Sequence, residues 1–343
     1  MAVFMKRQVY IVSSATVVGL EEKDGPLGEF FHECDYNDDT FGCNTWEKAE
    51  SEMQRLALGK ALSFAGKKDT DIEMLFAGDL LNQCIGSNYG LLDYDISYIG
   101  LYGACSTAAE GLMLASMLCS GEIVTTCASV ASSHNASAER QFRSPLEYGG
   151  QRSPTAQWTV TGAGAFVVSS DRESLFFEKN KPEYAARITA AEPGKSLDAG
   201  INDVTNMGAA MAPAAADTIL RFFKETKQSA KDFDLILTGD LGYEGTVILH
   251  DLMKCEGYDI SGCHNDCGLL IYDRKRQDKH AGGSGCGCSA VVLGAYILEK
   301  VRQGKYKKLL FVGTGALMSP MSLQQGLSIP GIAHLVQIES EKL

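Results

Sequence analysis

Apolar and polar residues alternate along the chain in blocks that predict strands and helices in turn. Residues 9–12 and 72–77 are short apolar runs typical of buried strands. Between them, apolar residues recur at the spacing of one helix face: Trp46, Ala49, Met53, Leu56 and Ala57. With Asn44 as the N-cap, this pattern predicts a helix over residues 45–64. A later helix is predicted with Pro213 in its first turn. Strands and helices in alternation predict an α/β fold.

The segment from Leu101 to Gly121 places a cysteine where an apolar strand ends and a helix begins. Small and apolar residues recur at helical spacing after Cys105, so Cys105 is predicted at the first turn. The free amides and positive dipole end of a helix N-terminus lower a thiol's pKa and favour a nucleophile, or else bind a carboxylate ligand. Packing alone explains such a cysteine equally well, because free cysteine is among the most buried residue types.

The same succession of elements occurs twice in the sequence. Cys288-Ser289 repeats Cys105-Ser106 at an offset of 183 residues, and each pair precedes an apolar helix and a buried strand. Upstream, the Gly-Asp-Leu turn at Asp79 is repeated at Asp240. Three matched features in one order indicate an internal duplication. We therefore predict two similar α/β halves, residues 1–178 and 179–343, packed face to face.

Composition and charge narrow the function classes. The 343 residues are 45% apolar and 22% charged with a net charge of −12, which argues against general nucleic-acid binding and against direct attraction to anionic lipid. The first residues are broken by Lys6, Arg7 and Gln8, so we expect no secretory signal, and no apolar run is long enough for a membrane helix. With 11 cysteines and no export signal, the expectation is a soluble protein with reduced thiols.

A long irregular segment is predicted over residues 132–161, and it gathers polar and basic side chains in an otherwise acidic protein. His134, Asn135 and Arg140 lie in it, and a guanidinium group offers two parallel hydrogen bonds to a carboxylate. A solvated loop with arginines paired to Glu139 and Glu147 is the alternative.

A metal site and a nucleotide loop are both disfavoured by spacing. The cluster of Cys263, His264, Cys267, Cys286 and Cys288 lacks the usual zinc spacings. The GGSGCGC run lacks the G-x-G-x-x-G pattern. We predict no metal and no cofactor.

Several longer strings carry a family resemblance: EKDGPLG, AGDLLNQ, SSHNASAERQFRSPLEYGGQ, MGAAMAPAAADTI, HNDCGLLIY, AGGSGCGCSAVV and SIPGIAH. Together with the duplicated body and the cysteine turn, they resemble the stage V sporulation protein AD family, within the thiolase and ketoacyl-synthase superfamily. The resemblance spans residues 22–334. It implies a thiolase-like fold of two mixed five-stranded sheets in an α/β/α/β/α arrangement.

The resemblance also implies binding in place of catalysis. The family is associated with dipicolinic acid, which is moved with calcium into the developing spore of spore-forming Firmicutes and released on germination. The expected partners are other SpoVA proteins, which would hold the chain peripherally at the spore inner membrane. Related thiolase folds commonly form dimers, so a homodimer is expected as well.

Condensing enzymes of this superfamily pair the cysteine with a histidine and either an asparagine or a second histidine from the second half. The strand match places the expected histidine at Gly239 and the expected asparagine in the turn Gly283-Ser284-Gly285. We therefore predict no catalytic residue. The predicted ligand-binding residues are Cys105, Asp79, Asn82, His134, Arg140, Asp240, Ser284 and Cys286. Two alternatives stay open: an acyltransferase that uses Cys105, and a scaffold for the SpoVA membrane partners that binds no small ligand.

Overall fold

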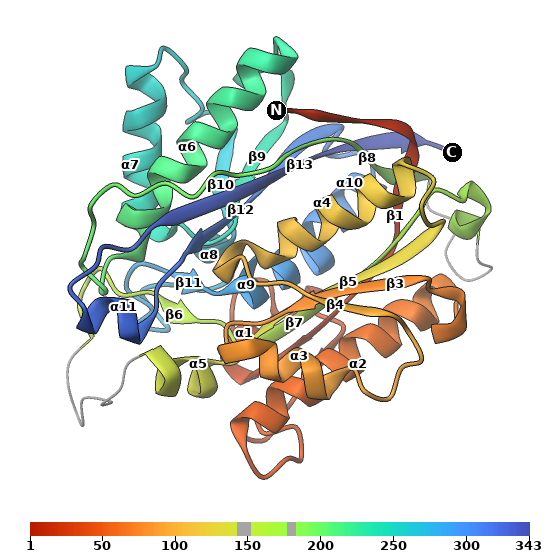
Figure 1. The fold of residues 1–343 in the computed structure, drawn as a ribbon, viewed down its shortest axis with the longest axis horizontal. Coiled ribbons are helices and arrows are strands. Elements are labelled where there is room, and N and C mark those ends of the chain that lie inside the picture. Colours follow the sequence, from red (N-terminus) through yellow and green to blue (C-terminus); the bar gives the residue numbers. More distant parts are fainter. Residues whose placement is uncertain (143–151, 177–182) are drawn as a thin grey trace.

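The chain folds into five layers of helices and sheet strands. The computed structural model describes residues 1–142, 152–176 and 183–343. In Figure 1, helices α6 and α7 cover one side, helices α2 and α3 cover the other, and α4 with α9 and α10 fill the middle between two groups of strands. The predicted boundary between residues 178 and 179 lies outside the described residues.

The strands form one large sheet and a separate two-stranded pair. Those of the large sheet, in chain order, are β1 (Val3–Val18), β2 (Glu33–Cys34), β3 (Met74–Gly78), β4 (Tyr98–Gly100), β5 (Thr126–Ser133), β7 (Gly162–Ser169), β8 (Tyr184–Glu192), β9 (Leu235–Thr238), β10 (His264–Asp266), β12 (Lys308–Ala316) and β13 (Gly331–Lys342). Two further short strands, β6 (Trp158–Thr159) and β11 (Gly283–Ser284), pair in parallel with one another.

The strand order confirms the duplication. The large sheet runs β10-β9-β12-β13-β8-β1-β7-β5-β3-β4, with β2 paired to β1. From the centre of the sheet outward, one half runs β1-β7-β5-β3-β4 and the other runs β8-β13-β12-β9-β10. In each half the order in the chain is therefore first, fifth, fourth, second and third, and the parallel and antiparallel pairings are the same in both halves. The two five-stranded halves are joined where β1 pairs with β8, a link that the periodicity of the sequence does not predict.

Eleven α-helical segments are described between and around the strands. They are α1 (Leu20–Lys23), α2 (Trp46–Ala65), α3 (Ile85–Gly90), α4 (Thr107–Ser120), α5 (Asn135–Phe142), α6 (Met207–Thr226), α7 (Gly242–Cys255), α8 (Cys267–Leu270), α9 (Cys286–Val291), α10 (Leu298–Arg302) and α11 (Pro320–Gln324). A π-helical stretch, Val292–Ile297, joins α9 to α10. No helix in the described ranges has the length and hydrophobicity needed to span a membrane.

Two helix starts differ from the sequence-based expectation. The side chain of Thr45, one residue after Asn44, caps α2 by accepting a hydrogen bond from the Lys48 amide. Asn206 caps α6 through the amide of Ala209, so the helix begins earlier than predicted and Pro213 lies inside it. The first-turn assignment of Pro213 is wrong because an asparagine upstream offered a better cap.

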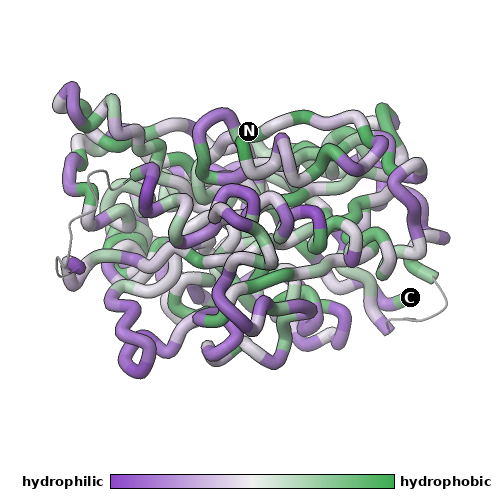
Figure 2. Tube along the Cα trace, turned by 90° about the horizontal axis from the view of Figure 1, so that it is seen from below, coloured by the Kyte–Doolittle hydropathy of each residue, from purple (hydrophilic) through white to green (hydrophobic). Residues whose placement is uncertain are grey.

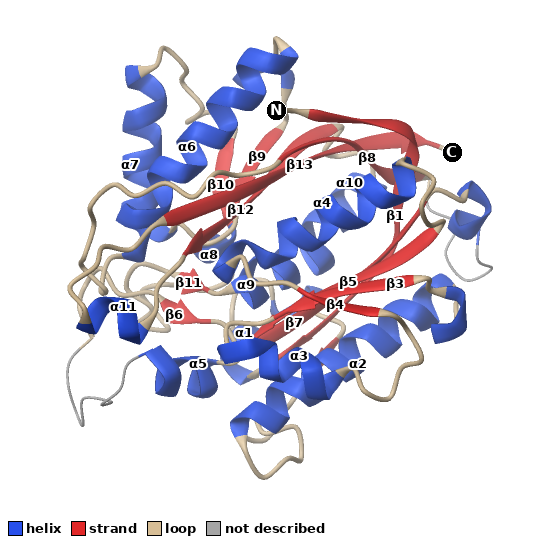
Figure 3. Cartoon of the chain, in the orientation of Figure 1, coloured by secondary structure: helices blue, strands red, loops and turns tan. Residues whose placement is uncertain are grey.

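The hydrophobic core lies on both faces of the strands. One cluster joins the two halves, and its members include Leu112 of α4, Val291 of α9, Phe166 of β7 and Phe311 of β12. Two outer clusters lie under α6 and under α2. Figure 3 shows the strands as two layers with helices between and outside them, and in Figure 2 the hydrophilic stretches lie mainly along the periphery.

The segment predicted as irregular contains two regular elements. Residues 135–142 form α5, which buries Ser137 and Ala138, and β6 follows at Trp158. Residues 143–151 lie outside the described part of the chain. A single amphipathic helix of about two turns is too short for its period to stand out in the sequence.

Candidate functional site

Cys105 lies in a turn that leads directly into the central helix α4. It is the middle residue of a short 3₁₀ helix, Ala104–Ser106, and only 5% of its surface is exposed. The preceding residue, Ala104, has a φ of 49°, a left-handed conformation that costs a residue with a side chain about 1 kcal/mol or more. Strain of this kind is kept where the surrounding structure needs a side chain at a particular place.

Two polar side chains of the second half face this thiol. The Oγ of Ser284 lies 4.0 Å from the Sγ of Cys105 and donates a hydrogen bond to Oδ2 of Asp240, 3.1 Å away. The Asp240 carboxylate also accepts hydrogen bonds from the Gly285 amide at 2.8 Å and from Thr314 Oγ1 at 2.8 Å. In the contact between Ser284 Oγ and Cys105 Sγ, either atom can be the donor.

The electrostatics of this centre keep the thiol protonated. Burial raises the pKa of Cys105 well above its ordinary value, and the nearby Asp240 charge raises it further, while the hydrogen bond with Ser284 acts in the opposite direction. Burial also raises the pKa of Asp240. Of the alternatives that the sequence left open for Cys105, the acidic nucleophile is disfavoured, because burial and the Asp240 carboxylate raise the pKa of the thiol.

No histidine in the described residues makes a hydrogen bond or ion pair with Cys105. The six histidines have other partners: His32 contacts Thr16, His134 the Asp39 carbonyl, His250 and His264 each other, His280 the Ser153 carbonyl and His334 the Gly194 amide. Gly239, the position matched to the expected histidine, packs against Thr314. Asp240, one residue on, is one of the two second-half side chains that face the thiol.

Asp79 belongs to a second buried acidic centre. Its carboxylate accepts hydrogen bonds from the Leu81 amide at 2.9 Å and from the amide and hydroxyl of Ser87 at 2.8 and 2.6 Å. Glu50 of α2 lies beside it and accepts from Ser132 and Ser137 at 2.9 and 2.8 Å. Both carboxyls are almost fully buried.

Burial and the neighbouring Asp79 raise the pKa of Glu50 to about 8, and burial raises the pKa of Asp79. The sequence reasoning missed Glu50, although a signal was present: a charged residue lies on the same helix face as Met53 and Ala57, which the pattern assigns to the core.

Cys286 lies between the two acidic centres. Its thiol donates to the Ser132 carbonyl at 2.8 Å. Its pKa is raised well above the ordinary value by burial, then by Glu50, Asp79 and Asp240. It is thus a neutral donor with its hydrogen bond already made.

Asn82 and Arg140 line an open cavity of about 400 Å³ above the Asp79 centre, together with Glu47, Leu81, Gln83, Ile85, Ser137 and Gln141. Arg140 forms an ion pair with Glu47 of α2, and its guanidinium lies 5.7 Å from the Trp46 ring centre. This cavity is hereafter called the Arg140 groove.

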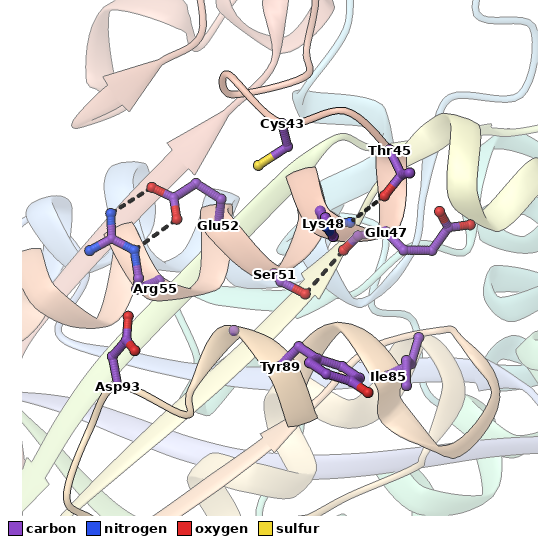
Figure 4. A pocket seen from close by; sticks show the side chains of 11 residues that line it. Cys43, Thr45, Glu47, Lys48, Ser51, Glu52, Arg55, Ile85, Tyr89 and Asp93 are labelled. Carbon is purple, nitrogen blue, oxygen red and sulfur yellow. Dashed lines mark hydrogen bonds and ion pairs between the residues drawn. The ribbon is translucent and has the colours of Figure 1, made fainter.

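A second cavity of about 460 Å³ adjoins the Arg140 groove and shares Glu47 and Ile85 with it. Figure 4 shows Cys43 above it, Tyr89 and Ile85 of α3 below, and the paired side chains of Glu52 and Arg55 at one end. Between α3 and the end of β3, Gln83 and Cys84 have φ values of 56° and 52°. Two successive left-handed residues with side chains mark this turn as strained, as at Ala104.

Both ring nitrogens of His134 make hydrogen bonds to the backbone, so neither is free to bind a ligand in this conformation. Its Nδ1 accepts from the Ala136 amide at 3.2 Å, so Nε2 carries the proton and donates to the Asp39 carbonyl at 2.9 Å. Burial lowers its pKa, so the ring stays neutral.

The predicted ligand residues therefore fall into three groups. Cys105, Asp240 and Ser284 meet around the thiol, with Cys286 behind them. Asn82 and Arg140 line the groove, Asp79 lies beneath it, and His134 supports the chain nearby. In the ranges the structure describes, no three His, Cys, Asp or Glu side chains are placed to share a metal ion.

Comparison with known proteins gives one family and one fold. The sequence model of stage V sporulation protein AD (SpoVAD) matches residues 1–339. The curated stage V sporulation protein AD of Bacillus subtilis (strain 168) is 45% identical over 333 residues, which cover 96% of this chain and 94% of the relative.

Solved structures of thiolase-like enzymes share the fold at low sequence identity. A single-residue variant of OleA from Xanthomonas campestris superposes with a TM-score of 0.61 at 15% identity, covering 98% of this chain and 100% of that chain. A 3-oxoacyl-(acyl carrier protein) synthase III, FabH, from Xanthomonas oryzae pv. oryzae gives 0.59 at 16% identity, covering 99% and 100%. The predicted thiolase-like α/β fold is thereby confirmed.

Proposed function

Because the chain belongs to the stage V sporulation protein AD family, we propose that it is a non-catalytic sporulation protein that binds dipicolinic acid, as the free dianion or as its calcium chelate. The observation that supports binding without catalysis is the pairing of Cys105 with Asp240 and Ser284. A thiol nucleophile needs a base to take its proton, or a neighbour that stabilises the thiolate. Here the neighbouring carboxylate stabilises the neutral thiol.

The Arg140 groove suits the free dianion. Dipicolinate is a flat ring with two carboxylates, and the groove offers a guanidinium, an amide side chain at Asn82 and enough volume for one small ring. The Cys105 centre is less suited, because the buried Asp240 repels a dianion. The calcium chelate has almost no net charge and brings a cation that prefers oxygen ligands, so it suits the Cys105 centre better.

We also propose that the protein acts peripherally at the spore inner membrane, held there by SpoVA membrane partners. Support for a partner surface comes from a concentration of exposed apolar side chains in α3 and in the segment between α3 and α4. Ile85, Tyr89, Leu92, Ile99 and Tyr102 are each at least 36% exposed within 18 residues. Patches of this kind mark interaction sites on soluble folds.

The same surface includes β4, the end strand of the described sheet. Its exposed edge and Ile99 support a homodimer in which two copies pair strand to strand. Light scattering during gel filtration tests this: the wild type should have twice the chain mass and Ile99→Asp the single mass. A monomeric wild type contradicts the dimer.

Thermal unfolding with added ligand tests the proposed function. A ligand at 100 times its Kd stabilises the native state by about 2.7 kcal/mol, which for a chain of this size raises the midpoint by about 4 °C. Dipicolinate and calcium dipicolinate should each raise it. Arg140→Ala should reduce the shift with free dipicolinate and Cys105→Ala the shift with the chelate. Arg7→Ala is the control, because Arg7 also pairs with a glutamate but lines neither cavity.

Two outcomes contradict the proposal. If neither form of dipicolinate shifts the midpoint while SpoVA partners still bind, the protein is a scaffold. If an acyl-CoA shifts the midpoint and labels Cys105 covalently, it is an acyltransferase.

A further inference from the structure

Glu50 and Asp79 converge from two different elements on the same small residue. A side chain added at Gly86 of α3 would lie 3.2 Å from Asp79 Oδ2 and 3.3 Å from Glu50 Cγ. Glu50 is 1% exposed and Asp79 is fully buried. Two carboxylates this close in a buried place repel one another, so the pair holds a proton more readily than either would alone.

Among the residues that the structure describes, the groups that interact with the pair carry no positive charge. From α9 the Cys286 thiol faces both carboxyls, and Cys84, Tyr98 and Tyr102 face Asp79 from the turn before α3, from β4 and from the loop after it. All four groups are neutral at pH 7, since the pKa of each is raised. Other neighbours in the described residues are uncharged as well: the hydroxyls of Ser87, Ser132 and Ser137, the side-chain amide of Gln54 and the backbone amides of Leu81 and Ser87.

Gln54 gives independent support for a bound proton. Its Nε2 donates to Ser87 and Ser132, but its Oε1 is buried and has no donor. A buried acceptor without a donor costs roughly 1 to 3 kcal/mol. Glu50 lies one helical turn before Gln54 and shares the Ser132 hydroxyl with it, so a protonated Glu50 carboxyl is a candidate donor for this oxygen.

The pair is bonded directly to the lining of the Arg140 groove. Ser137 and Leu81 both line the groove, and they donate to Glu50 Oε2 at 2.8 Å and to Asp79 Oδ1 at 2.9 Å. Only one residue therefore separates an anion in the groove from each carboxyl, and the medium between the anion and the carboxyls is low-dielectric protein. Its charge favours the protonated pair, and by reciprocity the protonated pair favours the anion.

We propose that anion binding in the Arg140 groove is coupled to the uptake of a proton by the Glu50–Asp79 pair. The inference rests on the proposed function, since it takes dipicolinate as the anion. The sign follows from the raised pKa of Glu50, about 8. Below that pH the pair already carries its proton and binding is independent of pH. Above it the free protein has lost the proton, which must be taken up again, so affinity falls as pH rises.

Titration calorimetry of wild-type protein with dipicolinate tests this without any substitution. At pH 8, binding is measured in Tris and in Bicine, whose ionisation enthalpies differ, so that any proton taken up adds a buffer-dependent heat. We expect net proton uptake at pH 8 and a Kd about fivefold or more larger at pH 9 than at pH 7. Carboxylic acids of the ligand itself do not titrate in this range.

Variants assign the proton to the pair. Glu50→Gln should abolish the proton uptake and leave the Kd constant between pH 7 and 9, and Asp79→Asn should do the same. Glu52→Gln is the matched control on the same helix, because Glu52 pairs with Arg55 and lines only the second cavity.

The outcomes separate the inference from the proposed function. Dipicolinate heats that are equal in both buffers, with one Kd from pH 7 to 9, overturn the coupling but leave binding intact. Proton uptake that persists in both variants overturns the assignment to this pair. If dipicolinate gives no heat at any pH, the proposed function is wrong and the coupling falls with it.

Discussion

Replacing Asp240 by asparagine should make the Cys105 thiol more acidic. The wild-type carboxylate accepts three hydrogen bonds, from Thr314, Ser284 and the Gly285 amide, which favour its ionised form. Asparagine has a similar shape and can retain the oxygen that faces Thr314, but it carries no charge. The substitution therefore removes the charge that holds the thiol neutral. It keeps the hydrogen bond from Thr314, but the amide nitrogen that replaces Oδ2 cannot accept from Ser284 or from the Gly285 amide.

The size of the effect follows from two contacts of Ser284. Its Oγ is 4.0 Å from Cys105 Sγ and 3.1 Å from Asp240 Oδ2. The sulfur and the carboxylate oxygen are therefore no more than about 7 Å apart, and at an effective dielectric constant of about 20 that separation corresponds to about 2 kcal/mol. This energy lowers the pKa of Cys105 by about 1.5 and raises its thiolate fraction about 30-fold.

The assay is the rate of alkylation by iodoacetamide between pH 7 and 11, followed at the Cys105 peptide by mass spectrometry so that the other cysteines do not contribute. The inflection of the rate profile reports the pKa. Ser284→Ala is the companion variant with the opposite sign, because the hydrogen bond from Ser284 lowers the pKa of Cys105. If Asp240→Asn leaves the inflection unchanged, or if both variants shift it in the same direction, the electrostatic account of this centre is refuted.

Three other substitutions test the fold. Thr45→Ala removes the cap of α2 and should lower the free energy of unfolding, measured by urea denaturation, by about 1 kcal/mol. An unchanged urea midpoint would mean that Asn44 caps the helix. Gly287→Ala should lower the free energy of unfolding by about 2 kcal/mol, because the new methyl group would clash with the Gly162 carbonyl and with Ser133 Oγ, 2.6 Å away. This loss is expected although alanine favours helices. A more stable variant would show that α9 can shift to make room. Burial raises the pKa of Glu22 from 4.5 to about 7. The contribution of Glu22 to wild-type stability should therefore be most favourable below pH 4.5 and should be lost as the pH rises through 7. Glu22→Gln should therefore gain up to about 3 kcal/mol relative to wild type at pH 8 and nothing at pH 4.5, measured by denaturation at both values.

Much of the architecture could be predicted from the sequence, because it depends on short-range periodicity and on repetition. The face of Trp46, Ala49 and Met53 predicted α2 to within a residue or two at each end. The repeated Cys-Ser and Gly-Asp-Leu segments predicted the two halves, and the strand order confirms them. Helix caps were harder to predict, because neighbouring residues such as Asn44 and Thr45 compete for the capping position. Short helices were harder to predict because a helix such as α5 is too short to show a period.

The candidate site was only partly predictable for a different reason. The sequence singled out Cys105, Asp240 and Ser284 separately, and the duplication matched Cys105 with Cys288 and Asp240 with Asp79. Only the folded chain shows that Ser284 links the thiol to the carboxylate. Only the folded chain also shows that Arg140 pairs with Glu47 across the groove and that both nitrogens of His134 are occupied by the backbone.

The sequence by itself determined which elements form, in what order and in two copies, because those properties follow from local hydrophobic patterns. The tertiary structure decided the chemistry. A thiol at a helix start has a lowered pKa when its surroundings are water and amides, and a raised one when it is buried beside Asp240. The same holds for Glu50, an ordinary helix residue in the sequence and a buried proton-binding candidate in the fold. Desolvation and the distance between charges from distant segments set these properties, and neither quantity exists until the chain has packed.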